Sequence, residues 1–530
     1  MAASRAFQIE DIIEEILDHL YPWDGVEYLQ IRERRKTLAS CARVDKFVHD
    51  IALDVLWRSM HDLRPLLKVL PAFQQATVHK DYRGRDTTEY TLLGRLSSED
   101  LHRFQLYARR IISLDITRSP YLVRRHSSVL LSLSRALGHQ PLLPRLRTLA
   151  WTHYNVTDHD VLYFVSPSLR SLTFHFTGAS GAVVKNMDSV PCRFLFEALC
   201  EQVAAAVPCL EKLSVLSEAS PYCFIPFGKC GGLREVTIGG HPSQCAYLGV
   251  LSSLDNLTKL DVRHVSELGQ DVVHWGSHGF RALKVLCVRG NPRSIGSVLM
   301  AFATSDITLL EVTIDPCDRQ TATDLLNIIK SQFNAALHKL ELLELPLQSA
   351  HGGSGSPLHP IPLMLGFHNL HTVSLSTWSK IAFSDEDLCT LASAWANIFS
   401  LHIRWMTAED VVMARPTLDC LPRIARSCPH LRRLDISSMN LTFAAGLDTY
   451  PILSHQLDYL DIHTGISNSQ KTDVMDVALF LDRLFPFLDA KKLRKLYIDE
   501  QPWLARVYDR LQGLHAVRMQ DTKRMVEGNV

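Results

Sequence analysis

Residues 431–436 read Leu-Arg-Arg-Leu-Asp-Ile, and this spacing of apolar residues returns along most of the chain. A first apolar residue is followed by a second three positions later and by a third two positions after that. Recurrence of this kind indicates an internally repeated architecture. The copies begin at Leu146, Leu169, Leu210, Leu233, Leu257, Leu283, Leu309, Leu337, Leu370, Ile398, Leu431, Leu457 and Leu493, with an earlier one at Ile111.

The spacing and the flanking residues strengthen this pattern. The step from Leu146 to Leu169 is 23 residues, and many other steps lie near a unit length of ~20–29 residues. The residues between the apolar positions are mostly polar, so each copy predicts a short strand with one buried face. In four copies a proline stands two positions before the first leucine, as Pro144, Pro167, Pro208 and Pro429.

One such strand cannot bury its apolar face alone, so we expect the strands to stack in a parallel array over one continuous core. The segments between copies predict helices, because Ser384, Thr321 and Thr472 each precede acidic residues and an apolar run. Strand followed by helix, many times over, resembles the leucine-rich repeat, and residues 283–291 fit its LxxLxLxxN pattern. The resemblance implies an α/β solenoid with parallel strands on its concave face and helices on its convex face.

The N-terminal segment has a different pattern. Residues 9–20, IEDIIEEILDHL, place their apolar side chains on one stripe of a helix. After a turn at 21–25, residues 34–47 and 51–60 predict two further short amphipathic helices. Three helices of this size bury little surface alone, so we expect them to pack on the repeat array or on another protein.

This segment resembles the F-box, and residues 41–57, CARVDKFVHDIALDVLW, are similar to a run in fungal F-box proteins. The family's opening Leu-Pro falls on Gln8-Ile9, and residues 21–37 make a longer first connection than is usual. By resemblance, the helices would dock on a Skp-type adaptor, which joins a cullin and a RING protein in a ubiquitin ligase. The matching apolar positions are Ile12, Ile16, Leu17, Leu38, Cys41, Val44, Leu56 and Trp57, with Trp57 as the expected anchor.

These patterns divide the chain into four parts. They are a three-helix F-box at 1–62, a helical linker at 63–105, a leucine-rich-repeat solenoid at 106–512 and a loose tail at 513–530. Residues 349–362, SAHGGSGSPLHPIP, are rich in Gly, Ser and Pro and predict a flexible loop within the array.

Charge and cysteine content narrow the class of protein. Lys+Arg and Asp+Glu balance at 56 each, which gives no overall field to attract nucleic acid or an anionic membrane. The 12 cysteines form no CxxC pair and have no zinc-site spacing, which predicts buried thiols and a cytoplasmic or nuclear location. The first residues do not resemble a signal peptide, and no apolar stretch approaches the ~18 residues of a membrane span.

No catalytic or metal motif stands out. The sequence contains no HExxH, GxxxxGK[ST] or GxSxG segment. The pair His368 and His371 is better explained as surface or packed histidines than as a metal site, and Asp158 and Asp160 as a helix opening. We therefore expect a protein that is not an enzyme and needs no cofactor.

Alternation along the strands places polar side chains on the expected concave face. Mixed charge with Tyr and His suits recognition of a protein, and tyrosine is enriched in binding hot spots. The candidates for contact with a target are Asp261, Arg263, Arg404, Asp435, Tyr459, Asp461, His463 and Tyr497.

The sequence thus predicts a substrate-recognition subunit of a Skp–cullin–F-box ubiquitin ligase, which would hold a target protein beside the ubiquitin-transfer machinery. Two alternatives stay open. A chain whose altered F-box does not dock would be a binding scaffold outside any ligase. A GTPase-activating repeat protein would need a critical arginine on its rim, for which Arg263, Arg289 and Arg404 are equal candidates.

Overall fold

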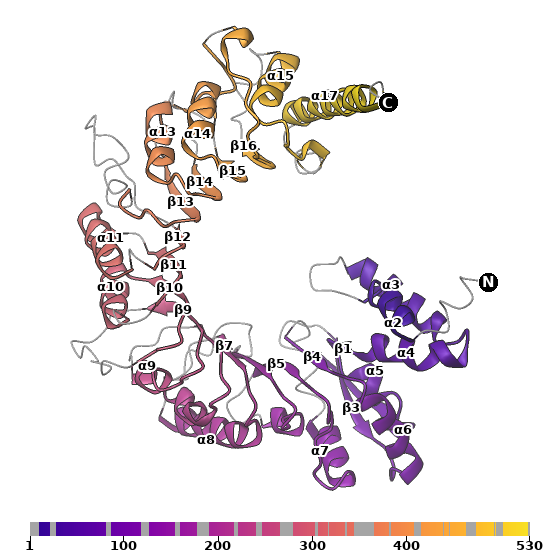
Figure 1. The fold of residues 1–530 in the computed structure, drawn as a ribbon. Helices are drawn as coiled ribbons and strands as arrows, with labels where there is room; N and C mark the ends of the chain where they lie inside the picture. Colours follow the sequence, from indigo (N-terminus) through magenta and orange to yellow (C-terminus); the bar gives the residue numbers. More distant parts are fainter. Residues whose placement is uncertain are drawn as a thin grey trace. The chain divides into compact units, whose positions relative to one another are not determined.

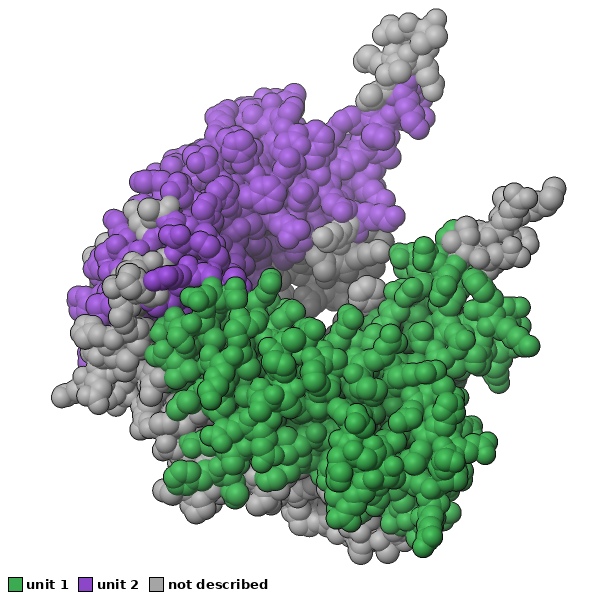
Figure 2. All heavy atoms as spheres, turned by 60° about the horizontal axis from the view of Figure 1, so that its bottom comes forward, with its two compact units in different colours: residues 1–257 green, residues 258–530 purple. Residues whose placement is uncertain are grey.

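The structure is a computed structural model that forms two compact units, residues 1–257 and 258–530, coloured green and purple in Figure 2. The residues that it describes are 10–21, 28–80, 86–117, 127–153, 159–176, 190–216, 221–239, 246–265, 279–302, 306–315, 317–333, 336–343, 365–380, 383–406, 415–437, 439–444, 446–462, 473–491, 493 and 502–527.

Three helices open the first unit: α2 (Glu10–Asp18), α3 (Tyr28–Cys41) and α4 (Lys46–Trp57). Helix α4 begins after Asp45, whose side chain accepts a hydrogen bond from the backbone N–H of Phe47 at 2.6 Å. The prediction of three short helices is confirmed, although α3 begins six residues earlier than expected. The helices share a small core made of Ile13, Leu17, Leu38, Ala42, Ile51, Ala52 and Val55.

The segment after these helices corrects the expected helical linker. It does contain helices α5 (Arg64–Leu67) and α6 (Ser98–Ala108), but strands β2 (Phe73–Lys80) and β3 (Asp86–Leu92) lie between them. The two strands pair antiparallel. Strand β3 contains three threonines and a tyrosine, and β2 contains Phe73, Thr77 and Val78; residues of these kinds favour extended backbone.

The first unit continues as a parallel array. Strand β1 (Ser59–Met60) directly follows α4 and pairs with β4 (Ser113–Asp115), so the array begins immediately after the helices. Parallel pairing continues through the strands β5 (Thr148–His153), β6 (Ser171–Phe176), β7 (Lys212–Leu216) and β8 (Glu235–Gly239). The intervening helical segments are α7 (Ser127–Ala136), η2 (Asp160–Tyr163), α8 (Val190–Ala206), η3 (Pro221–Lys229) and α9 (Ala246–Leu251).

The second unit repeats this plan, and its successive strands again pair in parallel. The strands are β9 (Lys259–Val265), β10 (Val285–Gly290), β11 (Leu309–Ile314), β12 (Lys339–Leu343), β13 (Thr372–Lys380), β14 (Ser400–Met406), β15 (Arg433–Ile436) and β16 (Tyr459–Ile462). The helical segments are α10 (Pro292–Ala301), α11 (Arg319–Phe333), α13 (Asp385–Ala394), η4 (Leu418–Cys420), α14 (Leu421–Ser427), η5 (Leu447–Thr449), α15 (Val474–Leu484) and α17 (Pro502–Glu527).

Buried and half-buried residues alternate along the strands, as the sequence pattern predicted. In β12, Leu340 and Leu342 are fully buried, whereas Lys339, Glu341 and Leu343 are half-buried. Leu340 is in register with buried apolar residues of both neighbouring strands, so the repeated positions stack into one core within the unit. Helices α10, α11, α13 and α14 cover one side of these strands (Figure 1). The opposite side of β9–β15, where no helix of the described residues lies, is called the helix-free face below. The chain is therefore an α/β leucine-rich-repeat solenoid.

Helix α17 corrects the expected loose tail at 513–530, because it is helical through Glu527. It packs against α15. The hydroxyl of Tyr508, which is fully buried, donates to the carbonyl of Leu460 in β16 at 2.9 Å. The first half of α17 thus contacts β16, the last strand of the array that the structure describes. The expected loop at 349–362 and the last strand copy at Leu496 and Ile498 lie outside the described residues.

Candidate functional site

Among the side chains described in residues 10–57, four large apolar ones face solvent. Ile12 and Ile16 of α2 are 38% and 46% exposed, and Val44 and Phe47, on either side of the α4 N-cap, are 78% and 41% exposed. Ile12 and Ile16 are four positions apart, so they share one side of α2. These four residues are called the exposed apolar set. Apolar side chains that a small helical segment leaves uncovered are candidates for contact with a partner protein.

Leu17 and Leu38, both expected to bind an adaptor, belong instead to the core of the three helices. They are 5% and 0% exposed, so they cannot touch a partner unless the helices rearrange. The structure thus removes Leu17 and Leu38 from the predicted adaptor contact. The reason is that the apolar side of each short helix packs against the other helices to form their shared core. Cys41 and Leu56 are partly buried against the same core and keep some exposed surface.

Trp57, the expected anchor, makes a contact inside the chain. Its ring lies against Tyr107 of α6, with 4.8 Å between ring centroids and a 43° tilt. The side chain is half-buried, so only part of it is available to a partner. Trp57 therefore connects the N-terminal helices to the segment that follows them.

Ion pairs fix the helices beside the start of the array. Arg58, between α4 and β1, donates to Asp18 at 2.8 Å and pairs with Glu14 at 3.2 Å. Arg110 pairs with Asp50 at 2.6 Å and with Asp54. Both arginines hold acidic side chains of the helices, so the exposed apolar set is carried on a supported segment.

A second candidate site lies on the helix-free face of the second unit. Strand β13 presents three small hydroxyl side chains there, Thr372, Ser374 and Ser376, and longer side chains flank them on both sides. The result is a hollow of about 580 Å³, called the β13 groove. Its walls include Lys339, Glu341 and Leu343 of β12, and His402, Arg404 and Arg433 of β14 and β15.

Strand register sets the order of side chains across the groove. Ser374 is in register with Glu341 on one side and with His402 on the other. His402 is in register with Asp435 of β15. Neighbouring strands are about 4.8 Å apart, so these side chains stand in a row within reach of one another.

Asp435 organises the wall on the β14 side although its carboxylate is only 1% exposed. One oxygen, Oδ2, accepts from Arg404 Nε at 2.9 Å and Nη2 at 2.5 Å, and lies 3.3 Å from His402 Nδ1. A carboxylate only accepts hydrogen bonds, so His402 Nδ1 donates to Asp435, and His402 Nε2 lies 2.7 Å from the Ser400 hydroxyl. The chain that the structure describes offers Oδ1 no hydrogen-bond partner.

These contacts change the acidity of the groups involved. Burial opposes ionisation of Asp435, but the hydrogen bonds from His402 and Arg404 outweigh it and hold the pKa of that carboxyl below its usual range. The hydrogen bond to Asp435 in turn raises the pKa of Arg404 despite partial burial. Arg404 is therefore a fixed cation, and its side chain is still 59% exposed.

The remaining charges of the groove differ in how they are paired. Lys339 Nζ lies 2.6 Å from Glu341 Oε1, so the β12 wall is neutral overall. Arg433 is exposed, and no acidic side chain in the described part of the chain pairs with it. The wall formed by β14 and β15 is therefore the cationic one.

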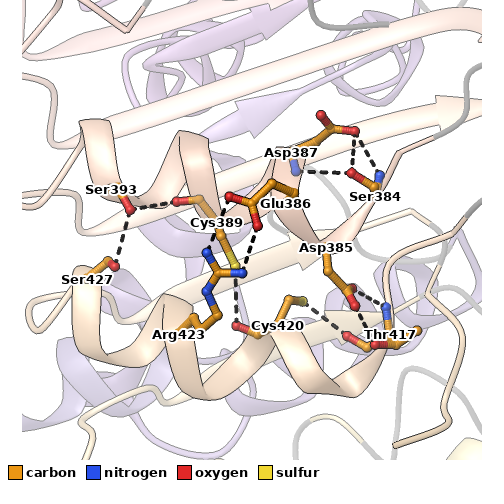
Figure 3. Close-up of polar contacts among 10 residues, drawn as sticks. All are labelled: Ser384, Asp385, Glu386, Asp387, Cys389, Ser393, Thr417, Cys420, Arg423 and Ser427. Atoms are coloured by element: carbon orange, nitrogen blue, oxygen red, sulfur yellow. Dashed lines mark hydrogen bonds and ion pairs between the residues drawn. The ribbon is translucent and has the colours of Figure 1, made fainter. Parts of the chain in front are cut away.

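Polar contacts between helices support this region from the other side of the sheet (Figure 3). Asp385 at the start of α13 accepts from the backbone N–H and the hydroxyl of Thr417, at 2.6 and 2.7 Å. Glu386 pairs with Arg423 of α14 at 2.9 Å. These contacts join consecutive repeats, so they fix the spacing of the strands that carry the groove walls.

The other predicted contact residues are placed as follows. Asp261 and Arg263 pair with each other at 3.2 Å on β9 and do not line the groove. On β16, the Tyr459 hydroxyl donates to Asp461 at 3.1 Å, and burial together with Asp461 raises the pKa of Tyr459 to about 12. Asp461 is in register with Asp435. His463 and Tyr497 lie outside the described residues.

Alternation in the sequence places Ser400, His402, Arg404 and Arg433 on this face, with Arg404 among the candidates for target contact, but the part of the groove formed by β12 and β13 was missed. The sequence signal for this part is the set of small residues at alternate positions of β13, Thr372, Ser374 and Ser376. Short side chains on one strand leave a hollow when the neighbouring strands carry longer ones. Phe47 was also left out of the adaptor set, although it lies in the same quoted run.

Metal sites and membrane-spanning helices are two further features to consider in the described residues. No group of three or more His, Cys, Asp or Glu side chains there could hold a metal ion. In the same residues, no helix combines the length and the apolar character that crossing a membrane requires.

No protein-family model matches this chain, and no curated protein is similar to it in sequence. Solved structures are similar to it. A Listeria monocytogenes internalin is 14% identical, with a TM-score of 0.27, over 65% of this chain and 74% of its own.

Two further structures are leucine-rich-repeat proteins. The Legionella pneumophila protein LegL7 is 16% identical, with a TM-score of 0.31, over 62% of this chain and 92% of its own. The ectodomain of the Arabidopsis thaliana receptor kinase GASSHO1/SCHENGEN3, solved in complex with CASPARIAN STRIP INTEGRITY FACTOR 2, is 12% identical, with a TM-score of 0.26. That match covers 72% of this chain and 44% of the ectodomain. The parallel register of the strands and the helices on one side of them show the leucine-rich-repeat fold of this chain.

Proposed function

We propose that this chain is the substrate-recognition subunit of a Skp–cullin–F-box ubiquitin ligase. Helices α2–α4 dock on a Skp-type adaptor and through it on a cullin, and the repeats hold the target protein. The chain itself is not an enzyme and uses no cofactor. One observation carries the proposal: a three-helix segment with uncovered apolar side chains leads directly, at β1, into a long repeat array.

The exposed apolar set is the proposed adaptor contact. Fully burying a large aliphatic side chain contributes roughly 1.5–3 kcal/mol, so covering several partly exposed ones supplies a useful share of a binding free energy. Ile12 and Ile16 are the sharpest positions to test, because they are exposed and lie on one side of α2. Trp57 is a poorer test, because its replacement would also remove the contact with Tyr107.

The proposed target contact is the helix-free face. Its strands present charged and hydroxyl side chains outward while the helices occupy the opposite side (Figure 1). Rigid elements that present alternating polar residues suit recognition of a protein surface or segment. The ligase proposal places this activity in the cytoplasm or the nucleus.

The experiment is co-purification of the full chain with a Skp-type adaptor. The wild type is compared with a double variant, Ile12→Asp with Ile16→Asp, which places charge on the proposed contact. The matched control is Val517→Asp, because Val517 is also an exposed apolar residue on a helix, at 57% exposure. We expect the wild type and the control to retain the adaptor and the double variant to lose it.

Two outcomes would overturn the proposal. A folded wild type that retains no adaptor would leave a binding scaffold outside any ligase. Equal retention by the double variant would remove α2 from the interface. Circular dichroism of all three proteins checks that the helices are intact.

A further inference from the structure

The first unit carries positive charge in the turns from which its strands begin. Strands β4 to β8 are each preceded by a four-residue turn, at 109–112, 144–147, 167–170, 208–211 and 231–234. These five turns contain six arginines and one acidic residue, Glu211. The corresponding positions before β9 to β16 hold three cations and three acids: Arg281, Lys284, Arg432, Asp255, Asp306 and Asp458. The excess of positive charge in these turns is therefore confined to the first unit.

Main-chain hydrogen bonds place the five turns side by side. The N–H of Arg147 donates to the carbonyl of Ile112, and the N–H of Arg170 donates to the carbonyl of Arg147, each at 2.8 Å. The same bond joins Glu211 to Arg170 and Arg234 to Glu211, again at 2.8 Å. Successive turns therefore keep the strand spacing of about 4.8 Å. Together they form one continuous border, called the arginine edge.

Two arginines of this edge are already paired. Arg110 Nη2 lies 2.6 Å from Asp50 of α4, and Arg110 Nη1 pairs with Asp54 of the same helix. Arg170 Nε lies 3.7 Å from Glu211, so that pair is a loose one. These contacts neutralise part of the edge, and they leave the other arginines as its source of positive charge.

Arg145 and Arg147 supply charge that the chain does not neutralise. They lie two positions apart in one turn, and both are exposed. No acidic side chain in the described part of the chain forms an ion pair with either of them, or with Arg109 in the preceding turn. Counting the acids Asp50, Asp54 and Glu211 against the six arginines, the edge keeps a formal charge of +3.

The composition of the edge indicates the class of its partner. A guanidinium is planar and can bind a carboxylate or a phosphate through two parallel hydrogen bonds. Single-stranded nucleic acid is held by aromatic side chains on which its bases stack, as well as by charge. The turns 109–112, 144–147 and 167–170 contain no aromatic residue. Carboxylates of a protein therefore fit this edge better than a nucleic acid does.

We propose that the arginine edge binds a polypeptide segment rich in aspartate and glutamate. Arg145 and Arg147 contact carboxylates of that segment, and Arg109 extends the contact to the preceding turn. This surface belongs to the first unit, whereas the β13 groove belongs to the second. The inference goes beyond the proposed function, because the contact needs neither an adaptor nor a ligase.

The test measures binding of labelled probes to the full chain by fluorescence anisotropy. One peptide contains a run of alternating Asp and Glu residues, and a second has Asn and Gln at the same positions. The third probe is a single-stranded DNA with the same number of negative charges as the acidic peptide. The DNA distinguishes a protein partner from a nucleic acid.

The site variants are Arg145→Glu with Arg147→Glu, and Arg145→Gln with Arg147→Gln. The control is Arg506→Glu with Arg510→Glu, which makes the same charge change at two exposed arginines of helix α17. Circular dichroism checks that all of the proteins are folded. The glutamine variant removes the charge without reversing it, so it separates lost attraction from added repulsion.

We expect the wild type and the control to bind the acidic peptide about tenfold more tightly than the neutral one, and less tightly as salt is added. The glutamate variant should lose about tenfold in affinity, and the glutamine variant less. Equal affinity of the wild type for the two peptides, or an unchanged glutamate variant, would overturn the proposal. An equal loss in the control, or tighter binding of the DNA than of the acidic peptide, would overturn it as well.

Discussion

At the scale of single residues, apolar side chains of the N-terminal helices have two separate roles. Leu38 is fully buried among the three helices, and Ile16, on the neighbouring helix, is 46% exposed. The predicted adaptor contacts contain both kinds, and only packing separates them. This division leads to a simple prediction about stability.

Leu38→Ala should lower the local free energy of unfolding of α2–α4 by about 2–5 kcal/mol, because it leaves a cavity in a small core. Ile16→Ala should change it by less than about 1 kcal/mol, since the side chain is already largely in water. Hydrogen exchange of the backbone amides in these helices measures both changes. Similar effects of the two substitutions would show that the core is placed wrongly.

The Asp435 carboxyl gives a prediction about pH. Its pKa in the folded chain lies below the ordinary value of 3.8, so ionisation stabilises the fold fully above about pH 4. That contribution is lost as the pH falls through the lower folded-state pKa. The thermal midpoint of the wild type should therefore fall more steeply below about pH 4 than that of Asp435→Asn. Parallel curves for the two proteins would mean that Asp435 is not paired as described.

At the scale of elements, local signals explain where several helices begin. Ser384 and Asp387 form a reciprocal capping box at the start of α13, with backbone–side-chain distances of 3.2 and 2.9 Å. Asn291, the residue that completes the LxxLxLxxN pattern, caps α10 by accepting from the backbone N–H of Arg293. These starts depend on residues within one turn, which is why a sequence pattern can predict them.

Ser384→Ala should lower the local stability of α13 by about 1 kcal/mol, because the backbone N–H of Asp387 loses its cap. Faster hydrogen exchange in the first turn of α13 is the expected readout. Ser97→Ala is the matched control, since Ser97 and Asp100 form the same box on α6 in the other unit. Its effect should stay within α6. Unchanged exchange in α13 would contradict the capping role.

The elements that sequence analysis missed depend on contacts distant in the chain. Strand β1 has two residues and exists because it pairs with β4. Hairpin β2–β3 is polar, so its strands show no strong apolar alternation. Helix α17 was not predicted, although Leu504, Val507, Tyr508 and Leu511 have helical spacing.

At the scale of the whole molecule, a repeat array needs its last core face covered. Residues from the first half of α17 do this at β16, where Tyr508 is fully buried and bonded to Leu460. The second half carries exposed residues such as Met519, at 65% exposure. The two halves should therefore tolerate deletion very differently.

Deletion of residues 502–530 should open β16 and α15, because α15 loses its packing on α17 and Leu460 of β16 loses its hydrogen bond from Tyr508. Deletion of residues 520–530 should leave both protected. Limited proteolysis and hydrogen exchange of the second unit report the difference. Equal protection after both deletions would show that α17 does not cap the array.

The candidate site on the helix-free face also has features that one strand predicts and features that depend on contacts between strands. Alternation within a strand predicted that Arg404 and Asp435 face outward. Arg404 is 59% exposed, as predicted, whereas the Asp435 side chain is only 1% exposed because Arg404 and His402 cover it. Their direct contact joins residues 31 positions apart, and the groove needs four strands with side chains of different heights. The sequence predicts each strand by itself, but it does not show which long and short side chains of neighbouring strands come to lie next to each other.

The central claim is that the N-terminal helices are a docking segment for a Skp-type adaptor. The most direct test is hydrogen exchange of the full chain with and without the purified adaptor. We predict new protection within residues 10–57, and none in strands β12–β15. Protection on those strands instead, or no protection anywhere under conditions where the adaptor is in excess, would contradict the account.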